Sequence, residues 1–369
     1  MTSRSGLLIS CLSVSLLVLA GCGSNESSGT ESSSDTAAGD GATSIELTDF
    51  HGRAMTLDSP VSASVFLVEN AMNTMYAVGG GSSIVGTGDI WQPSFKEAFF
   101  EGVQPGFSDL PVVASNDGLY DLEAVAQLNP DFVVLWAESP DDKAIAAIED
   151  GLQVPVYAVF LRSFDDLDKL TIDLAAAAGN PARGVEVNEL VSDTLQRIEE
   201  ISAQIDTADK PSVYWMWGDV FGTAGTESSA SDLIEIAGGV NVVSEMADGD
   251  ATQEQPVLSM EQIVELNPDV IYMWFNPDID PSDVMEGKTV GTTDFSTWQG
   301  LDAVKNGLVF ELDDPFMYDF MTGRTPIAAL KVAKDINSEA FEGWDLSEEY
   351  DDYFRAMYGV GYPGFEPES

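Results

Sequence analysis

Cysteine and histidine are almost absent from this chain of 369 residues. The two cysteines, Cys11 and Cys22, both lie within residues 1–22, so we expect no disulfide and no thiol chemistry in the folded part of the chain. The single histidine, His51, excludes a site built from several imidazoles, such as many zinc or manganese sites. We interpret His51 as a solvent-facing residue of a turn, remote from any ligand, and we expect no resident metal and no cofactor.

Basic residues are scarce as well. Lys and Arg together number 15 against 63 Asp and Glu, which gives a formal net charge of −48. Such a surface repels nucleic acids and anionic lipid head groups, so we expect no nucleic-acid partner. The acids do not follow the D-x-D-x-D-G spacing of a calcium-binding loop. We therefore interpret the charge as a solubility device of a protein from a salt-loving organism.

Apolar runs of transmembrane length are lacking too. The run from Leu7 to Ala20 is shorter than the about 20 residues that a spanning helix needs. It follows Arg4 and ends in Leu19-Ala20-Gly21-Cys22, which resembles the lipobox of lipoproteins. We interpret residues 1–22 as a lipoprotein signal peptide with Cys22 as the lipid anchor. Ordinary signal cleavage beside an incidental cysteine is the alternative.

Residues 23–44 contain only Gly, Ser, Thr, Ala, Asn, Asp and Glu. A segment of this composition cannot bury apolar area, so it predicts a disordered tether. Together with the signal peptide, it predicts an extracytoplasmic protein that a lipid anchor holds at the outer face of the cell membrane.

Motifs of known catalytic sites are missing. The sequence has no nucleophile elbow, Walker loop, dinucleotide-binding fingerprint or H-E-x-x-H motif. A surface hydrolase that uses two carboxylates stays open as an enzyme hypothesis, although a pair of acids among 63 is no signal. An adhesion or structural lipoprotein is a third possibility, but the extended or repeated β pattern that it requires is missing. We expect no enzyme.

One short sequence segment occurs twice in the chain. Residues 122–136 read L-E-A-V-A-Q-L-N-P-D-F-V-V-L-W, and residues 260–274 read M-E-Q-I-V-E-L-N-P-D-V-I-Y-M-W. Each copy predicts a short helix that stops at Asn-Pro, because a residue before proline disfavours the α region. A buried strand that ends in tryptophan follows. The repeat predicts two similar lobes whose tryptophans face each other across a cleft.

The rest of the chain indicates an α/β fold. Residues 45–57 predict a β-hairpin, and short apolar runs then alternate with helical stretches, which is typical of lobes with mostly parallel sheets. Residues 180–210 begin with Asn-Pro and carry apolar residues at helical spacing, which predicts one long helix between the lobes. The expected strands are 64–68, 83–85, 132–136, 156–160, 213–217, 240–243, 270–274 and 308–312. The expected lobes are 45–179 and 211–369.

These stretches, in this order, resemble the substrate-binding lipoproteins of ABC importers for iron–siderophores, haem and cobalamin. The resemblance is carried by D-F-H-G-R-A-M-T-L (49–57), the doubled unit, S-A-S-D-L-I-E-I-A-G-G-V-N-V-V (229–243) and W-Q-G-L-D-A-V-K-N-G-L-V-F (298–310). It implies two lobes joined by one helix, a small-molecule metal chelate in the cleft, and a dimeric permease with its ATPase as partner. It also implies that Glu123 and Glu261 dock onto that permease. Ordinary helix-start carboxylates are the alternative for both residues.

Ligand-binding residues are expected just after the carboxyl ends of the strands, where parallel sheets bind ligands. Large rings there suit a macrocycle or aromatic chelate, and core packing is the alternative for each ring. Arg162 suits an anionic group of the ligand, or else a salt bridge. A small anion such as molybdate also stays open. The candidates are Asn70, Trp91, Trp136, Glu138, Arg162, Trp217, Phe221, Trp274, Asn276, Phe316, Tyr318 and Arg324.

Overall fold

A computed structural model describes residues 44–88, 99–114, 120–246, 251–274, 276–314 and 316–362. The expected signal peptide with Cys22, nearly all of the tether and Trp91 lie outside these ranges. None of the helices in the described ranges combines the length and apolar character that crossing a membrane requires.

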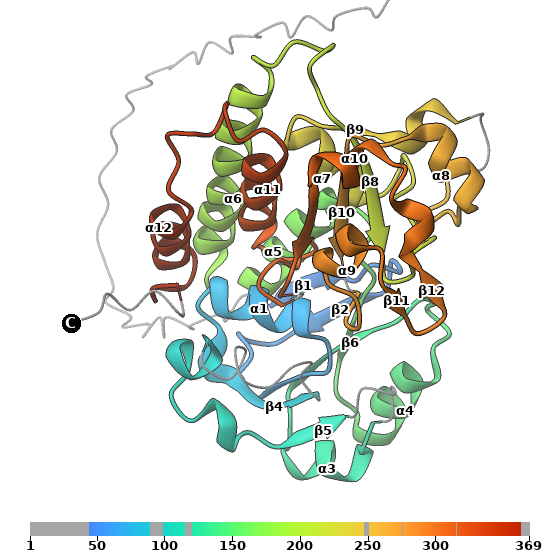
Figure 1. Cartoon of the computed structure of the whole chain (residues 1–369). Coiled ribbons are helices and arrows are strands. Elements are labelled where there is room, and N and C mark those ends of the chain that lie inside the picture. The colour runs from blue at the N-terminus through green and yellow to red at the C-terminus, as the bar shows by residue number, and fades with distance from the viewer. Residues whose placement is uncertain are drawn as a thin grey trace, which may run out of the picture. The chain divides into compact units, whose positions relative to one another are not determined.

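Two parallel sheets organise the chain (Figure 1). The first has the strand order β5-β4-β3-β6-β7, and the second has the order β13-β10-β8-β9. An antiparallel hairpin of β1 (Ile45–Thr48) and β2 (Ala54–Leu57) precedes the first sheet. The strands of the two sheets are β3 (Ser64–Phe66), β4 (Ile84–Gly88), β5 (Val112–Ala114), β6 (Phe132–Trp136), β7 (Val156–Val159), β8 (Ser212–Trp217), β9 (Val240–Asn241), β10 (Val270–Trp274) and β13 (Val309–Leu312).

The predicted α/β class is therefore confirmed, as are the hairpin and the eight strand runs, several with shifted ends. Three short strands were not predicted: β5, and the antiparallel pair β11 (Thr289–Val290) and β12 (Thr293–Asp294). Each has only two or three residues, which is too few to show a periodicity.

The two sheets share one plan. In both, the strand of the repeated unit pairs with the strand at the start of its half, so β6 pairs with β3 and β10 pairs with β8. On its other side each repeated strand pairs with the next strand of the same sheet along the chain, β7 or β13. The repeat in the sequence thus corresponds to a repeat in topology.

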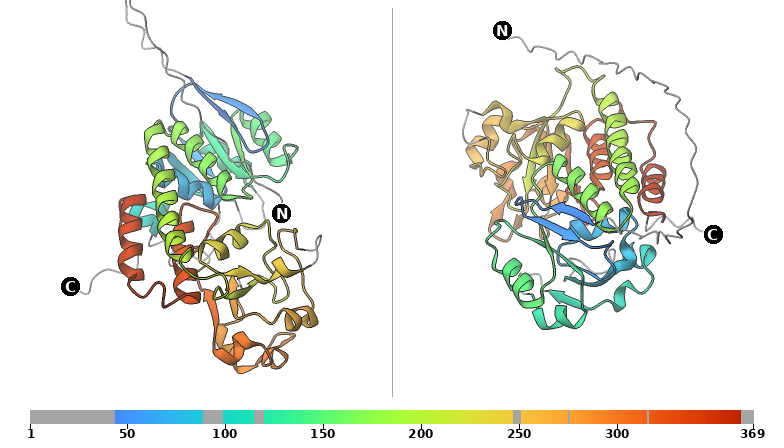
Figure 2. Two further views of the ribbon diagram at one scale, coloured as in Figure 1. Left: turned by 90° about the horizontal axis from the view of Figure 1, so that it is seen from above. Right: turned by 180° about the vertical axis from the view of Figure 1, so that it is seen from behind.

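Helices enclose the sheets. The longest is α6 (Pro181–Ser202), which ends short of the expected residue 210 because Ala203 to Ile205 turn away. It packs on α5 (Phe164–Ala177), α11 (Thr325–Ile336) and α12 (Leu346–Tyr358). Figure 2 shows α6, in yellow-green, beside the red helices α11 and α12. Further α-helices are α1 (Glu69–Ala77), α3 (Leu122–Gln127), α4 (Lys143–Leu152), α7 (Ser229–Ile236), α8 (Met260–Leu266), α9 (Pro281–Glu286) and α10 (Asp302–Asn306). Short 3₁₀ turns are η1 (Gly81–Ser83), η2 (Phe107–Asp109), η3 (Val242–Glu245) and η4 (Phe295–Trp298).

The strands read as continuous apolar runs because both faces of each sheet are covered. One face of both sheets joins a single hydrophobic core, in which Phe132 and Val134 belong to the same cluster as Trp215 and Leu330. The opposite faces form two separate clusters, one for each sheet. The two halves of the chain are thus connected through a common layer of buried side chains.

The N-P-D turn of the repeat pins each sheet together. Asn129 and Asn267 take left-handed φ values of 47° and 42°, which ends the helix just before the proline. Asp269 Oδ2 then accepts from the backbone N–H of Ser212 at 2.9 Å and from its hydroxyl at 2.7 Å. Asp131 accepts in the same way from Ser62. Each aspartate therefore fixes the chain at the entry to the neighbouring strand.

Asp269→Ala should lower the free energy of unfolding by about 2 kcal/mol, because two hydrogen bonds to one carboxylate are lost at a strand entry. Urea unfolding at constant high salt measures the change. Asp278→Ala is the matched control, because Asp278 is exposed and has no hydrogen bond or ion pair among the described residues. Equal unfolding midpoints for the two variants would show that the turn does not hold the sheet.

Candidate ligand-binding site

The carboxyl end of the first sheet presents an aromatic and cationic patch. Trp136 is the last residue of β6, and its side chain is 37% exposed. Its ring meets Phe160, just beyond β7, edge to face at a centroid distance of 5.4 Å. The exposed Arg162 places its guanidinium carbon 5.5 Å from the centre of the same Phe160 ring. We call Trp136, Phe160, Arg162 and the adjacent His51 the first-sheet patch.

His51 belongs to this patch. Its imidazole stacks on Phe160 with a centroid distance of 6.0 Å and an interplanar angle of 23°. Its Nε2 lies 2.8 Å from the carbonyl oxygen of Ala137, the residue that follows Trp136. The side chain is half-buried. The prediction of a solvent-facing histidine is therefore wrong, because the hairpin turn folds back onto the strand ends.

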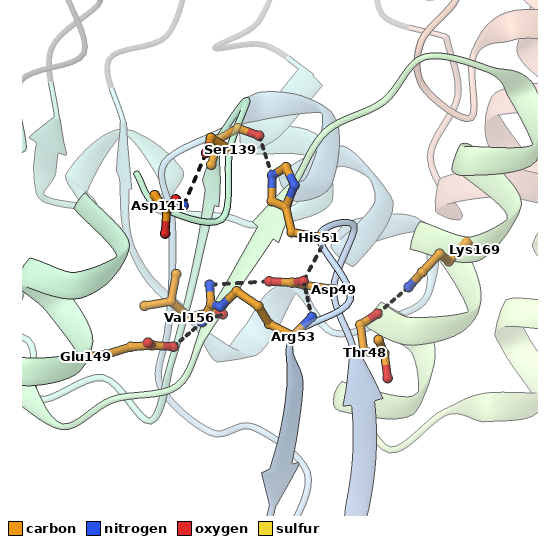
Figure 3. Close-up of polar contacts among 10 residues, drawn as sticks. Thr48, Asp49, His51, Arg53, Ser139, Asp141, Glu149, Val156 and Lys169 are labelled. Atoms are coloured by element: carbon orange, nitrogen blue, oxygen red, sulfur yellow. Dashed lines mark hydrogen bonds and ion pairs between the residues drawn. The ribbon is translucent and has the colours of Figure 1, made fainter. Parts of the chain in front are cut away.

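Charged contacts hold the hairpin turn in place (Figure 3). The buried carboxylate of Asp49 accepts the backbone N–H of His51 and of Arg53, both at 2.9 Å, and its other oxygen lies 3.3 Å from the Arg53 guanidinium. Arg53 also pairs with Glu149. Lys169 donates to the carbonyl of Thr48 from the opposite side. The turn is thus clamped to the first sheet on both flanks.

The second sheet ends in two neighbouring tryptophans. Trp217 and Trp274 are partners in register at the ends of β8 and β10. Both rings meet Phe320, at centroid distances of 6.3 Å and 5.3 Å. Each tryptophan of the repeat thus contacts a phenylalanine from the segment after the next strand of its sheet: Trp136 contacts Phe160, and Trp274 contacts Phe320.

The two tryptophans of the repeat differ in exposure. Trp274 is 8% exposed, against 37% for Trp136, because Phe320 covers it. Phe320 itself is buried, since the segment after β13 folds over the strand ends. In this conformation the second tryptophan is a packed residue, and the exposed aromatic surface belongs to the first sheet.

Asn70 connects that covering segment to the other half of the chain. It lies near the start of α1, and its amide donates to Asp319 Oδ2 at 2.9 Å and to the Met321 carbonyl at 3.0 Å. Tyr318, in the same segment, is buried, which raises its pKa to about 12. Asn70 and Tyr318, both expected to bind ligand, are here engaged in holding the segment.

Arg324 is fully buried at the start of α11. Its Nη1 donates to Asn73 Oδ1 at 3.2 Å, and its guanidinium carbon lies 4.0 Å from the centre of the Phe316 ring. Among the residues that the structure describes, Nε and Nη2 have no hydrogen-bond acceptor. The structure therefore places Arg324, with Phe316, in the interior between α1 and α11.

The remaining expected residues are dispersed. Phe221 packs against Trp298 in the outer cluster of the second sheet, away from Trp217. Asn276 is buried and donates to the Gly218 carbonyl at 3.1 Å, while Glu138 is exposed just after Trp136. The sequence reasoning missed Phe160 and Phe320. Their signal was their position, since each follows a predicted strand directly or closely.

One carboxyl group near the second strand ends is perturbed. Glu311 in β13 pairs with Met273 in register, and burial together with nearby Asp280 and Asp313 raises its pKa to about 7. At neutral pH it therefore carries only part of a negative charge. Within the described ranges no group of three or more His, Cys, Asp or Glu could hold a metal ion.

Glu123 and Glu261 have equivalent positions. Each is the second residue of its helix, α3 or α8, and each is exposed. The helices are capped alike, by Asp121 accepting from the Ala124 N–H and by Ser259 accepting from the Gln262 N–H. Two similar carboxylates are thus presented on the outside of the two halves.

Comparison with known proteins identifies the class. The chain belongs to the periplasmic binding protein family, whose model matches residues 69–316. This is a family of extracytoplasmic solute-binding proteins, and its relatives serve ABC transporters. Its two-lobed α/β architecture with parallel sheets is that of this chain.

One curated protein and two solved structures are similar to this chain. A cobalamin-binding protein of Halobacterium salinarum is 27% identical over 257 residues, which cover 66% of this chain and 65% of that protein. The molybdate-binding protein MolA of Haemophilus influenzae superposes with a TM-score of 0.69 at 18% identity, covering 86% of this chain and 98% of its own. The vitamin B12-binding protein BtuF of Vibrio cholerae gives a TM-score of 0.56 at 20% identity, covering 76% and 98%. These structural matches establish the fold alone.

Proposed function

We propose that this protein captures a metal chelate outside the cell and delivers it to the permease of an ABC importer. Cobalamin is the first candidate, before haem and iron–siderophores. The observation that carries the proposal is the first-sheet patch, which offers a large exposed ring and a cation at the strand ends, where parallel sheets bind ligands. Similarity to a cobalamin-binding protein supports the same choice.

The chemistry of the patch favours a large ligand over a small oxyanion. Trp136 and Phe160 provide apolar area and a ring face, which suit the edge and plane of a macrocycle. A molybdate-sized anion instead needs several convergent hydrogen-bond donors, and Arg162 is the single cation of the patch. Arg162 is suited to a peripheral anionic or amide group of the chelate.

Delivery completes the proposed role. Lobes formed by residues 45–179 and 211–369 would hold the ligand between them, with Glu123 and Glu261 facing the two halves of the permease. Lipidation of Cys22 would keep the protein at the outer face of the membrane. No turnover of the ligand is expected.

Calorimetry in about 3 M KCl tests the ligand with cobalamin, haem, a ferric siderophore and molybdate. Trp136→Ala should weaken binding of the true chelate roughly 10- to 100-fold, because about 1.5–3 kcal/mol of ring contact is lost. Trp344→Ala is the matched control, since Trp344 is half-buried beyond α11 and packs on Arg197. The proposal fails if none of the chelates binds at micromolar concentration.

A further inference from the structure

The sole histidine of the chain has the geometry of a metal ligand. We propose that His51 Nδ1 coordinates the metal of the captured chelate at a position that an exchangeable water occupies in the free chelate. This inference rests on the proposed function and adds to it the kind of chelate that the site selects: one with an open or water-filled axial position.

The hydrogen-bond acceptor of His51 shows which nitrogen of the imidazole carries the proton. The carbonyl oxygen of Ala137 can only accept, so Nε2, at 2.8 Å, carries the hydrogen of that bond. In the neutral ring Nδ1 is then the atom with the free lone pair. Within the described ranges no hydrogen bond engages Nδ1. Metal-binding histidines in general donate the second ring N–H to a carbonyl or carboxylate, which fixes the tautomer and orients the ring.

The ring is also held in one orientation. Phe160 stacks on its face, and Asp49 fixes its backbone N–H. Asp49 is itself buried against Arg53. The same contacts hold the hairpin turn on the strand ends. They also fix the direction of the Nδ1 lone pair before a metal arrives, which is the preorganisation that a metal ligand needs.

The surroundings match a chelate in size and polarity. Ala137 follows Trp136, and the imidazole and the exposed indole both contact the Phe160 ring. Arg162 contacts the same Phe160 ring that carries His51. One nitrogen ligand, one ring surface and one cation thus lie in one patch, suited to a flat chelate with an axial position and a polar rim.

A bare ion does not fit this site. Within the described ranges no cluster of three or more His, Cys, Asp or Glu exists, and one imidazole alone holds a metal ion weakly. The chelate must therefore supply the other ligands. The step is a ligand exchange: the metal–water bond breaks, water leaves, and the Nδ1 lone pair forms the new bond. The oxidation state is unchanged, and Nε2 keeps its proton and its bond to Ala137.

Aquocobalamin and cyanocobalamin provide the test, because they share one corrin and differ in whether the axial group exchanges. The full chain in about 3 M KCl should bind aquocobalamin at least about 10-fold more tightly, and the visible band of the cobalt should shift as imidazole replaces water. His51→Gln, whose amide can still donate to Ala137, should lose both the preference and the shift. Any loss of affinity for cyanocobalamin in this variant measures the ring contact of His51 without coordination, so the ratio of the two affinities is the test. His51→Phe, which keeps an aromatic ring on Phe160, should likewise lose the preference for aquocobalamin and the band shift.

Other outcomes separate the two proposals. Equal affinity for both corrinoids without a band shift would overturn the coordination by His51 and leave chelate capture standing. If neither corrinoid binds and ferric haem does, the same His51→Gln comparison is made on the haem absorption band, and an unchanged band overturns the inference. If no chelate binds, the proposed function and the inference fail together.

Discussion

Exchanging both Glu123 and Glu261 for arginine should abolish delivery of the ligand while leaving its capture intact. Each substitution alone should weaken association with the permease by about 2 kcal/mol, because an interfacial charge is reversed. The double variant should then lose about 4 kcal/mol, or roughly 1,000-fold in affinity. Uptake by cells and pull-down of the permease measure the loss, and calorimetry shows that ligand affinity is unchanged.

The expectation depends on the equivalence of the two sites. Both glutamates are exposed second residues of capped helices, one in each copy of the repeated unit. A binder with two equivalent charges suits a permease built from two equivalent subunits. Val264, one turn after Glu261 in α8, is 52% exposed and would add apolar contact at the same surface.

The control separates position from charge. Glu189→Arg with Glu199→Arg on α6 changes the net charge by the same amount at two exposed sites outside the repeat. That variant should deliver ligand normally. Normal delivery by the Glu123 and Glu261 double variant as well would mean that these residues are ordinary helix-start carboxylates, favoured by the helix dipole alone.

The local structure of the repeat could be predicted because its signals are local. Asn before proline ends a helix wherever it occurs, and a run such as Phe132 to Trp136 has few alternatives to a buried strand. The clamps made by Asp131 and Asp269 could not be predicted in this way. Each carboxylate bonds to a serine of a strand far away in the sequence, and no pattern of spacing encodes that pairing.

The candidate site shows the same division. That aromatic residues gather at the strand ends was a prediction from topology, and in the structure Trp136 and Arg162 both contact the ring of Phe160 there. His51 was misread because a D-F-H-G-R turn is locally polar, whereas its docking onto Ala137 is a tertiary contact. The unequal exposure of Trp136 and Trp274 depends on Phe320, whose segment has no regular structure that a sequence pattern could reveal.

Lowering the salt concentration should destabilise the protein strongly. The net charge of −48 includes a row of exposed acids on α6, among them Glu189, Asp193 and Glu200. Glu189 and Asp193 are four residues apart, and side chains at that spacing on a helix lie about 5–6 Å apart, so their like charges repel. The screening length is about 10 Å at 0.1 M salt and about 3 Å at 1 M, so only high salt removes that repulsion.

Thermal unfolding followed by circular dichroism measures the effect. Between about 3 M and 0.1 M KCl we expect Tm to fall by about 10 °C, which corresponds to about 7 kcal/mol for a folded part of this size. The triple variant Glu189→Gln, Asp193→Asn and Glu200→Gln should show a smaller fall, because three of the repelling charges are gone while side-chain size is kept.

Sucrose at matched osmolality distinguishes screening from a general effect of excluded solute. Sucrose strengthens burial but cannot screen charge, so it should restore little of the Tm lost at 0.1 M KCl. A Tm that is equal at both KCl concentrations would contradict the role of charge outright. Full recovery in sucrose would do so as well, because the protein would then need dehydration and not screening. If Tm recovers in KCl but not in sucrose, and if the effect of KCl on Tm is smaller in the triple variant, the acidic surface serves stability in salt. Ligand recognition then belongs to the first-sheet patch.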